Sequence, residues 1–232
     1  MDTPILSVRD LNVMFNLRGK KLHAIRGVSL DVYKGESLAI VGESGSGKSV
    51  FVKTFMGLLD ANGWISSGEI VYGGEKLTDY KTEKQWLKVR GGEIAMVLQD
   101  PMTSLNPLKT VGAQIIEAIE LHRPLKGAAA RHEMISLLKD VGIPEPERRA
   151  KQYPHEFSGG MRQRVVIAIA VACRPKVLIC DEPTTALDVT IQAQILSLIR
   201  SLKTKYNLTT VYITHDLGVV ANVADRIAVM YA

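Results

Sequence analysis

The most informative stretch of this sequence runs Ser37-Leu38-Ala39-Ile40-Val41-Gly42-Glu43-Ser44-Gly45-Ser46-Gly47-Lys48-Ser49. Its first five residues predict a buried strand. The glycine-rich remainder has the P-loop spacing, and a helical pattern follows over Val50–Leu59. The glycines allow successive backbone N–H groups to converge on one anion, and the positive end of a helix adds to that field. The stretch therefore predicts a site for the phosphates of a nucleoside triphosphate.

Lys48 and Ser49 have the most specific expected contacts in this loop. Lys48 can reach the β- and γ-phosphates, and the Ser49 hydroxyl can ligate Mg²⁺. Further contacts to the nucleotide are expected along the loop and the start of the helix, from Gly42, Glu43, Ser44, Gly45, Ser46, Gly47 and Val50. P-loops serve kinases, GTPases, helicases and transporters, so the loop alone leaves the function open.

Polar residues that could hydrolyse a nucleotide follow three other predicted strands. Asp181 and Glu182 come after the apolar run Val177–Cys180, where ligands collect in open α/β sheets. We expect Asp181 to hold Mg²⁺ through its water shell and Glu182 to orient or deprotonate the attacking water. His215 is expected to contact the γ-phosphate, and Gln99 to ligate Mg²⁺ and sense the γ-phosphate.

Composition sets outer limits on the class of protein. The chain has 232 residues, and its 46% hydrophobic content is ordinary for a globular protein. Its net charge of +5 suits a polyanionic ligand, nucleic acid or an anionic membrane surface and does not choose among them. Its two cysteines predict buried thiols and a reducing compartment. No secretory signal is expected at the N-terminus. The longest apolar run, Val165–Cys173, is too short to span a bilayer, so any membrane role is expected to come through a partner.

Short β-branched runs alternate with helical periodicity, which predicts an α/β fold with a mainly parallel sheet. The predicted strands are Ile5–Val8, Ser37–Val41, Ile94–Leu98, Val177–Cys180, Thr209–Thr214 and Arg226–Met230. Helical patterns cover Val111–Glu120, Ala129–Val141 and Thr190–Tyr206. We interpret the sequence as one domain, with a nucleotide-binding core at residues 1–99 and 173–232 and an inserted helical subdomain at residues 100–172.

One further segment indicates a protein family: Phe157-Ser158-Gly159-Gly160-Met161-Arg162-Gln163-Arg164. A serine and two glycines before a helical run form a second anion-binding arrangement, without a lysine. In order, the P-loop, Gln99, this signature, Asp181-Glu182, Ala186-Leu187-Asp188 and His215 resemble the ABC ATPase family over essentially the whole chain. The resemblance implies a RecA-like P-loop core with an antiparallel β edge, ATP and Mg²⁺ as ligands, and ATP hydrolysis.

The resemblance also implies that two subunits share each nucleotide. Ser158, Gly159 and Gly160 would contact the γ-phosphate bound to the opposite subunit, with Asp188 at the dimer seam, and Phe15 would stack on adenine. Phe15 also alternates as an ordinary strand residue, so a packing role is the alternative to adenine stacking. The sequence departs from the family pattern at Phe157, Met161 and Thr185. None of these removes a phosphate donor, so we expect activity to survive.

Within the family, Gln99–Pro107, Phe157–Arg164 and Thr184–Gln192 look like the ATP-binding subunits of oligopeptide, dipeptide and nickel uptake systems. This resemblance implies a second ATP-binding subunit, homologous or identical, two membrane permeases and an extracytoplasmic binding protein. It places the chain at the cytoplasmic face of the membrane, with no nucleic-acid partner. Members of the group continue past the position of Ala232, so we expect a C-terminally truncated piece.

Three other functions are compatible with a nucleotide site of this kind. The first is an ABC-type ATPase of DNA repair or translation, which usually carries a coiled-coil insertion or tandem cassettes. The second is an exporter motor, often fused to spanning helices. The third is a noncatalytic module lacking the equivalents of Glu182 or His215, both of which are present here.

Overall fold

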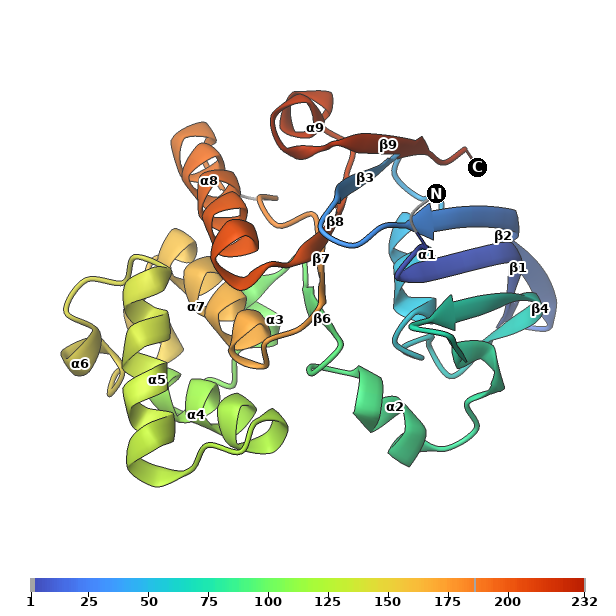
Figure 1. The fold of residues 1–232 in the computed structure, drawn as a ribbon. Coiled ribbons are helices and arrows are strands. Elements are labelled where there is room, and N and C mark those ends of the chain that lie inside the picture. The colour runs from blue at the N-terminus through green and yellow to red at the C-terminus, as the bar shows by residue number, and fades with distance from the viewer. Residues whose placement is uncertain (1–2, 186, 232) are drawn as a thin grey trace. The chain divides into compact units, whose positions relative to one another are not determined.

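Two sets of elements pack separately in the computed structural model, which describes residues 3–185 and 187–231 (Figure 1). The first unit comprises the residues up to Arg90 together with those from Thr209 onward, and the second comprises Gly91–Leu208. The expected division, with a helical subdomain at residues 100–172, stays a prediction. Ala186, part of the expected Ala-Leu-Asp motif, lies outside the described residues.

The first unit combines an antiparallel sheet with three parallel strands. In the antiparallel sheet the order is β2-β1-β4-β5, and the parallel strands follow the order β8-β3-β9. The elements are β1 (Leu6–Leu17), β2 (Lys20–Val32), β3 (Ser37–Val41), α1 (Lys48–Thr54), β4 (Gly63–Tyr72), β5 (Glu75–Lys76), a 3-10 turn (Leu77–Asp79), α2 (Glu83–Val89), β8 (Thr209–Thr214), α9 (Leu217–Val223) and β9 (Arg226–Val229). Strands β3 and β8 are buried at every position, as strands covered on both faces should be.

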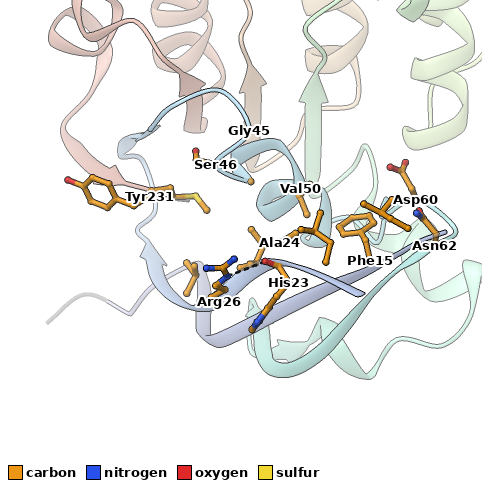
Figure 2. A pocket seen from close by; sticks show the side chains of 16 residues that line it. Phe15, His23, Ala24, Arg26, Gly45, Ser46, Val50, Asp60, Asn62 and Tyr231 are labelled. Atoms are coloured by element: carbon orange, nitrogen blue, oxygen red, sulfur yellow. Dashed lines mark hydrogen bonds between the residues drawn. The ribbon is translucent and has the colours of Figure 1, made fainter. Parts of the chain in front are cut away.

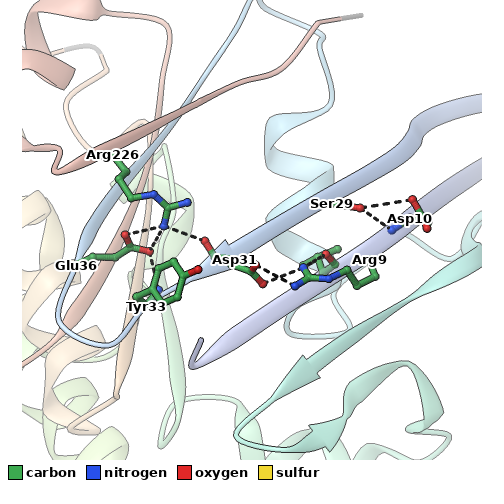
Figure 3. A network of polar contacts seen from close by, with 8 residues as sticks. Arg9, Asp10, Ser29, Asp31, Tyr33, Glu36 and Arg226 are labelled. Carbon is green, nitrogen blue, oxygen red and sulfur yellow. Dashed lines mark hydrogen bonds and ion pairs between the residues drawn. The ribbon is translucent and has the colours of Figure 1, made fainter. Parts of the chain in front are cut away.

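A polar network joins β9 to the end of β2 within this unit (Figure 3). Arg226 donates to the carboxylate of Glu36 at 2.9 and 3.0 Å, and its guanidinium lies 5.1 Å from the centre of the Tyr33 ring. Asp31 pairs with Arg9 on β1 at 2.8 Å. The hydrogen bond from Arg9 lowers the pKa of Asp31, although partial burial opposes the shift. Charged groups therefore fix the edge where the two sheets of the unit meet.

The second unit is a bundle of helices beside a pair of parallel strands. Its elements are β6 (Ile94–Val97), α3 (Pro101–Ser104), α4 (Val111–His122), α5 (Gly127–Asp140), α6 (Pro146–Arg149), a 3-10 turn (Pro154–Glu156), α7 (Gly159–Ala172), β7 (Val177–Asp181) and α8 (Val189–Tyr206). Helix α7 packs against α4, α5, α8 and β6, so most of its residues are buried. Both cysteines are buried thiols, as expected, and burial raises the pKa of Cys173 to about 11.

The structure confirms most predicted elements and corrects others. Strand Ile5–Val8 was predicted too short, because Asp10 adopts a φ of 45° and interrupts an alternation that β1 resumes afterwards. Strands β2, β4 and β5 were not predicted, since much of β2 and β4 is exposed and polar. The helix expected over Val50–Leu59 ends at Thr54, because Gly57 has a φ of 61° and packs against the Trp86 ring. Among the described residues, no helix is long and apolar enough to cross a bilayer.

We predict that Glu133 stabilises the second unit in a pH-dependent way. Burial alone would raise the pKa of Glu133, but Arg123 (2.7 Å) and Arg174 (2.6 Å) together lower it by more. The net shift of the Glu133 pKa is therefore downward. Since the folded pKa lies below the unfolded value of about 4.3, this contribution is present above that pH and is lost as the pH falls through the folded pKa. Glu133→Gln should cost about 1–2 kcal/mol at pH 7, measured by urea unfolding.

The control for this prediction is Glu147→Gln, which breaks a largely exposed pair with Lys139. The control variant should unfold at nearly the wild-type urea midpoint. If both variants lose the same stability, or if the cost of Glu133→Gln is unchanged well below pH 4, the partly buried ion pairs of Glu133 with Arg123 and Arg174 are not the cause.

Candidate nucleotide site

The P-loop backbone is pressed against strand β2. A Cβ at Gly47 would lie 2.7 Å from Cδ1 of Ile25 and 3.0 Å from the carbonyl oxygen of Ala24, so a larger residue would clash there. Gly45 and Gly47 have φ values of 83° and 88°, a conformation that glycine adopts without strain. A Cβ at Gly42 would lie 2.3 Å from the Met230 carbonyl. The three glycines are therefore needed for the path of the loop.

The loop holds its lysine in place from within. Lys48 is 5% exposed, and its ammonium donates to the carbonyls of Gly42 (2.8 Å) and Glu43 (2.7 Å). Ser46 is 4% exposed, and its hydroxyl has no hydrogen-bond partner within residues 3–185 and 187–231. A buried cation and a buried hydroxyl beside left-handed glycines make a cradle for phosphate, which donor groups of this kind bind well.

A cavity of about 510 Å³ opens beside this loop (Figure 2). Its lining includes Gly45, Ser46, Gly47, Val50 and Phe15. The Phe15 ring is largely covered, and a Cβ at Gly63 would lie 2.5 Å from it. The predicted phosphate loop and the predicted adenine-stacking residue thus border one cavity. The sequence did not predict the remaining lining residues, because most of them lie on or beside the unpredicted strands β2 and β4: Leu17, Leu22, His23, Ala24, Ile25, Arg26, Val28, Asp60, Asn62, Met230 and Tyr231.

His215 lies in the same unit, directly after β8, and its side chain is exposed. The next residue, Asp216, caps α9 by accepting hydrogen bonds from Gly218 (2.7 Å) and Val219 (3.4 Å). The backbone N–H of Asp216 in turn donates to the Thr214 hydroxyl at 3.0 Å. His215 therefore sits on a fixed corner between a buried strand and a capped helix, at the carboxyl end of the strand as the sequence predicts.

The second unit contains the predicted catalytic carboxylate. Glu182 follows β7 directly, and Gln99 lies two residues beyond the end of β6, the strand that pairs with β7. The side-chain amide of Gln99 and the hydroxyl of Thr185 both donate to Oε2 of Glu182 at 2.9 Å. Glu182 has a φ of 46°, which is unfavourable for a residue with a Cβ and costs of order 1 kcal/mol. The neighbouring Asp181 is 6% exposed.

Thr185 and Gln163 were not predicted to support this group. The Thr185 N–H donates to the Glu182 carbonyl at 3.1 Å, and the turn that this bond closes also brings the Thr185 hydroxyl to the carboxylate. A threonine three residues after Glu182 was therefore the sequence feature that could have predicted this contact. Gln163 is 1% exposed on α7 and donates to the Pro183 carbonyl at 2.8 Å. The signature helix is thereby tied to the turn that carries Glu182.

The signature residues begin helix α7. The Ser158 hydroxyl caps the helix by accepting from the Met161 N–H at 3.4 Å. A Cβ at Gly160 would lie 2.8 Å from Cγ2 of Ile191 on α8. Asp188 caps α8 by accepting from the Ile191 N–H at 3.0 Å. Ser158, Gly159, Gly160 and Asp188 therefore lie at the starts of two packed helices, where unpaired N–H groups favour anions.

A P-loop after a buried parallel strand, together with a carboxylate pair after another, is typical of the P-loop nucleotide-binding proteins. A family model described as ABC transporter matches residues 25–185. This match covers more than half of the sequence, and the chain belongs to the ABC transporter family. The expected α/β P-loop fold is thereby confirmed.

The relatives are named for peptide transport. The oligopeptide transport ATP-binding protein AmiE of Streptococcus pneumoniae is 58% identical over 98% of this chain. The oligopeptide transport ATP-binding protein OppD of Bacillus subtilis is 56% identical over 99% of this chain. The chain spans about 64% of the length of each of these relatives.

A solved structure gives the same fold at lower identity. The dimeric post-hydrolysis state of the ATP-binding cassette MJ0796, bound to ADP and Pi, is 29% identical with a TM-score of 0.84. The alignment covers 97% of this chain and 94% of that chain.

We predict that Ser46→Ala stabilises the ligand-free protein. The substitution removes a buried hydroxyl that has no partner in the described structure, so it removes a desolvation cost. We expect the Tm to rise by about 2–4 °C. Differential scanning calorimetry without nucleotide measures this, with the exposed Ser44→Ala as control. A fall in Tm for Ser46→Ala would show that the hydroxyl contributes a stabilising bond.

Proposed function

We propose that this chain binds Mg²⁺ and ATP, hydrolyses ATP and powers a peptide transporter. The observation that carries the catalytic part is the Glu182 carboxylate, held after a buried strand by Gln99 and Thr185. Membership of the ABC transporter family and the names of the relatives support the transport part. Peptides are the substrate class that those names favour.

The residues present fit a magnesium-bound nucleotide. The left-handed glycines, the buried Lys48 ammonium and the Ser46 hydroxyl, which has no partner among the described residues, offer donors to phosphate oxygens. The Phe15 end of the cavity offers an apolar surface to a base. Oxygen ligands are those that Mg²⁺ prefers. Ser49, Gln99 and Asp181 would hold the ion, and the bound ion would supply positive charge against the phosphates.

The chain's own groups then have separate tasks. Lys48 binds the β- and γ-phosphates, and Glu182 orients the attacking water and takes its proton. His215 contacts the γ-phosphate and keeps the water and Glu182 in place. Gln99 and Thr185 both donate to Oε2 of Glu182, so they fix the orientation of the carboxylate. Their hydrogen bonds limit the rotation of a side chain whose backbone is already in an uncommon conformation.

A second ATP-binding subunit completes each site in this proposal. Ser158, Gly159 and Gly160 contact the γ-phosphate held by the opposite P-loop, and Asp188 lies at the seam. The partner is a homologous subunit or a second copy of this chain. Loss of one preorganised anion donor costs about 2.7–4 kcal/mol in a transition state, so a lone subunit should turn over at least about a hundredfold more slowly than the assembly.

The remaining partners follow from the transport role. Two membrane permeases would carry the peptide, an extracytoplasmic solute-binding protein would deliver it, and this subunit would work at the cytoplasmic face. ATP binding closes the pair of ATP-binding subunits and hydrolysis reopens it, because the γ-phosphate contacts exist in the closed state alone.

We predict that Glu182→Gln binds ATP nearly as well as the wild type but hydrolyses it at least about a hundredfold more slowly, because an amide cannot accept the proton. Nucleotide affinity and phosphate release measure the two effects. Light scattering with Mg²⁺ and ATP gives the mass, and a nucleotide-dependent dimer of the variant would show that the chain pairs with itself. A variant that stays monomeric while binding ATP requires a different partner subunit.

Thr185→Val serves as the graded variant for this test. It removes one of the two donors to Glu182 and should lower turnover by a smaller factor, about three- to tenfold, with ATP affinity retained. Thr204→Val on the exposed face of α8 is the matched control and should leave turnover unchanged. If Glu182→Gln keeps more than a tenth of the wild-type rate, another group is the base.

A further inference from the structure

Strand β2 contains an extra residue beside the P-loop. Leu11 pairs with Val28 and Val13 pairs with Ile25, so two steps along β1 match three steps along β2. Within this interval Gly27 has a φ of 62°. These are the features of a β-bulge, which commonly redirects a side chain next to a functional site.

The bulge is fixed by the side chain of Asn12, which lies opposite it on β1. Oδ1 of Asn12 accepts from the Gly27 N–H at 3.0 Å and lies 2.9 Å from Nε2 of His23. The Asn12 amide nitrogen donates to the Asp10 carbonyl at 2.8 Å. One amide therefore holds both sides of the extra residue, so the direction in which Arg26 leaves the strand is set by the backbone.

Arg26 is the residue that the bulge redirects. It lines the cavity together with Gly45, Ser46 and Gly47, and Figure 2 shows its guanidinium raised from β2 toward the side on which Gly45 and Ser46 lie. Its Nε donates to the His23 carbonyl at 3.2 Å, and the guanidinium forms no other hydrogen bond within the described part of the chain. The terminal N–H groups remain available to a ligand.

The chemistry of the cavity favours an anion at this position. Lys48 is held by two carbonyls of its own loop and does not line the cavity, whereas Arg26 is the one arginine or lysine among the described residues of the lining. Asp60 is the acidic residue of the lining, and it forms no ion pair with Arg26 in the part of the chain that the structure describes. Arg26 is exposed at the cavity, and a guanidinium can bind phosphate through two of its N–H donors at once.

We propose that Arg26 binds the phosphate chain of the nucleotide and makes the site select nucleotides over nucleosides. This inference rests on the proposed ATP-binding function and adds a contact from outside the P-loop. The sequence pattern of the loop could not predict it, because Arg26 lies on a strand whose alternation is broken by the bulge.

The test compares the binding of ATP, ADP and adenosine to wild type, Arg26→Ala and Arg26→Lys. Isothermal calorimetry on the whole chain at low salt measures each Kd. For Arg26→Ala we expect about a tenfold rise in the Kd for ATP and ADP, with the Kd for adenosine within about twofold of wild type. Arg26→Lys keeps the charge and should recover part of the affinity. The difference between wild type and Arg26→Ala should shrink at high salt.

Lys21→Ala is the matched control, since Lys21 is an exposed cation of the same strand outside the cavity lining. It should bind all three ligands as the wild type does. Circular dichroism checks that Arg26→Ala is folded, and Arg26→Gln provides a second neutral variant of similar length.

Three results would overturn the inference. If Lys48→Ala loses ATP while Arg26→Ala binds ATP like the wild type, Arg26 makes no phosphate contact and the proposed function stands. An equal loss of adenosine and ATP by Arg26→Ala would place the contact on the nucleoside. A wild-type chain that binds no ATP would overturn this inference together with the proposed function.

Discussion

The close approach of the P-loop to strand β2 is the constraint on which the nucleotide site depends. Gly47 fits against Ile25 and the Ala24 carbonyl only because it lacks a Cβ, and the same left-handed backbone exposes N–H groups to a ligand. Packing and phosphate binding therefore require the same residue type. Strand β3 supplies the fixed support for the loop, since it is buried throughout and paired with β8 and β9.

In the second unit, side chains rather than glycines hold the backbone in an uncommon conformation. Glu182 is held in an uncommon backbone conformation, and its carboxylate accepts from an amide and a hydroxyl on one oxygen. Such a residue is costly for stability unless the surrounding structure determines its position. Gln163 on α7 helps to fix this position, because its buried hydrogen bond to the Pro183 carbonyl ties α7 to the turn that carries Glu182. Residues far apart in the sequence thus stabilise one small region.

Much of this could be predicted from the sequence, and the failures have physical causes. Strands β3 and β8 were predicted because burial on both faces makes them apolar throughout. Strand β2 was missed because one extra residue at Arg26-Gly27 breaks its alternation and much of its surface is exposed. The loop glycines were predicted by spacing, whereas the neighbours that require them, such as Ile25, are visible in three dimensions alone. Hydrogen bonds from Thr185 and Gln163 likewise depend on how distant segments fold together.

The helix-capping role of Ser158 is compatible with a contact to phosphate, because a hydroxyl can accept and donate at once. The oxygen of Ser158 accepts from the Met161 N–H, which uses a lone pair and leaves the hydroxyl hydrogen free for an anion. An aspartate would cap the helix equally well, but its negative charge would repel a phosphate. The carboxylate of Asp188 caps α8 as an acceptor, and an ionised carboxylate has no hydrogen to donate to an anion. Ser158 can therefore cap α7 and still donate to a phosphate. Asp188, which caps α8 beside it, would need a different role.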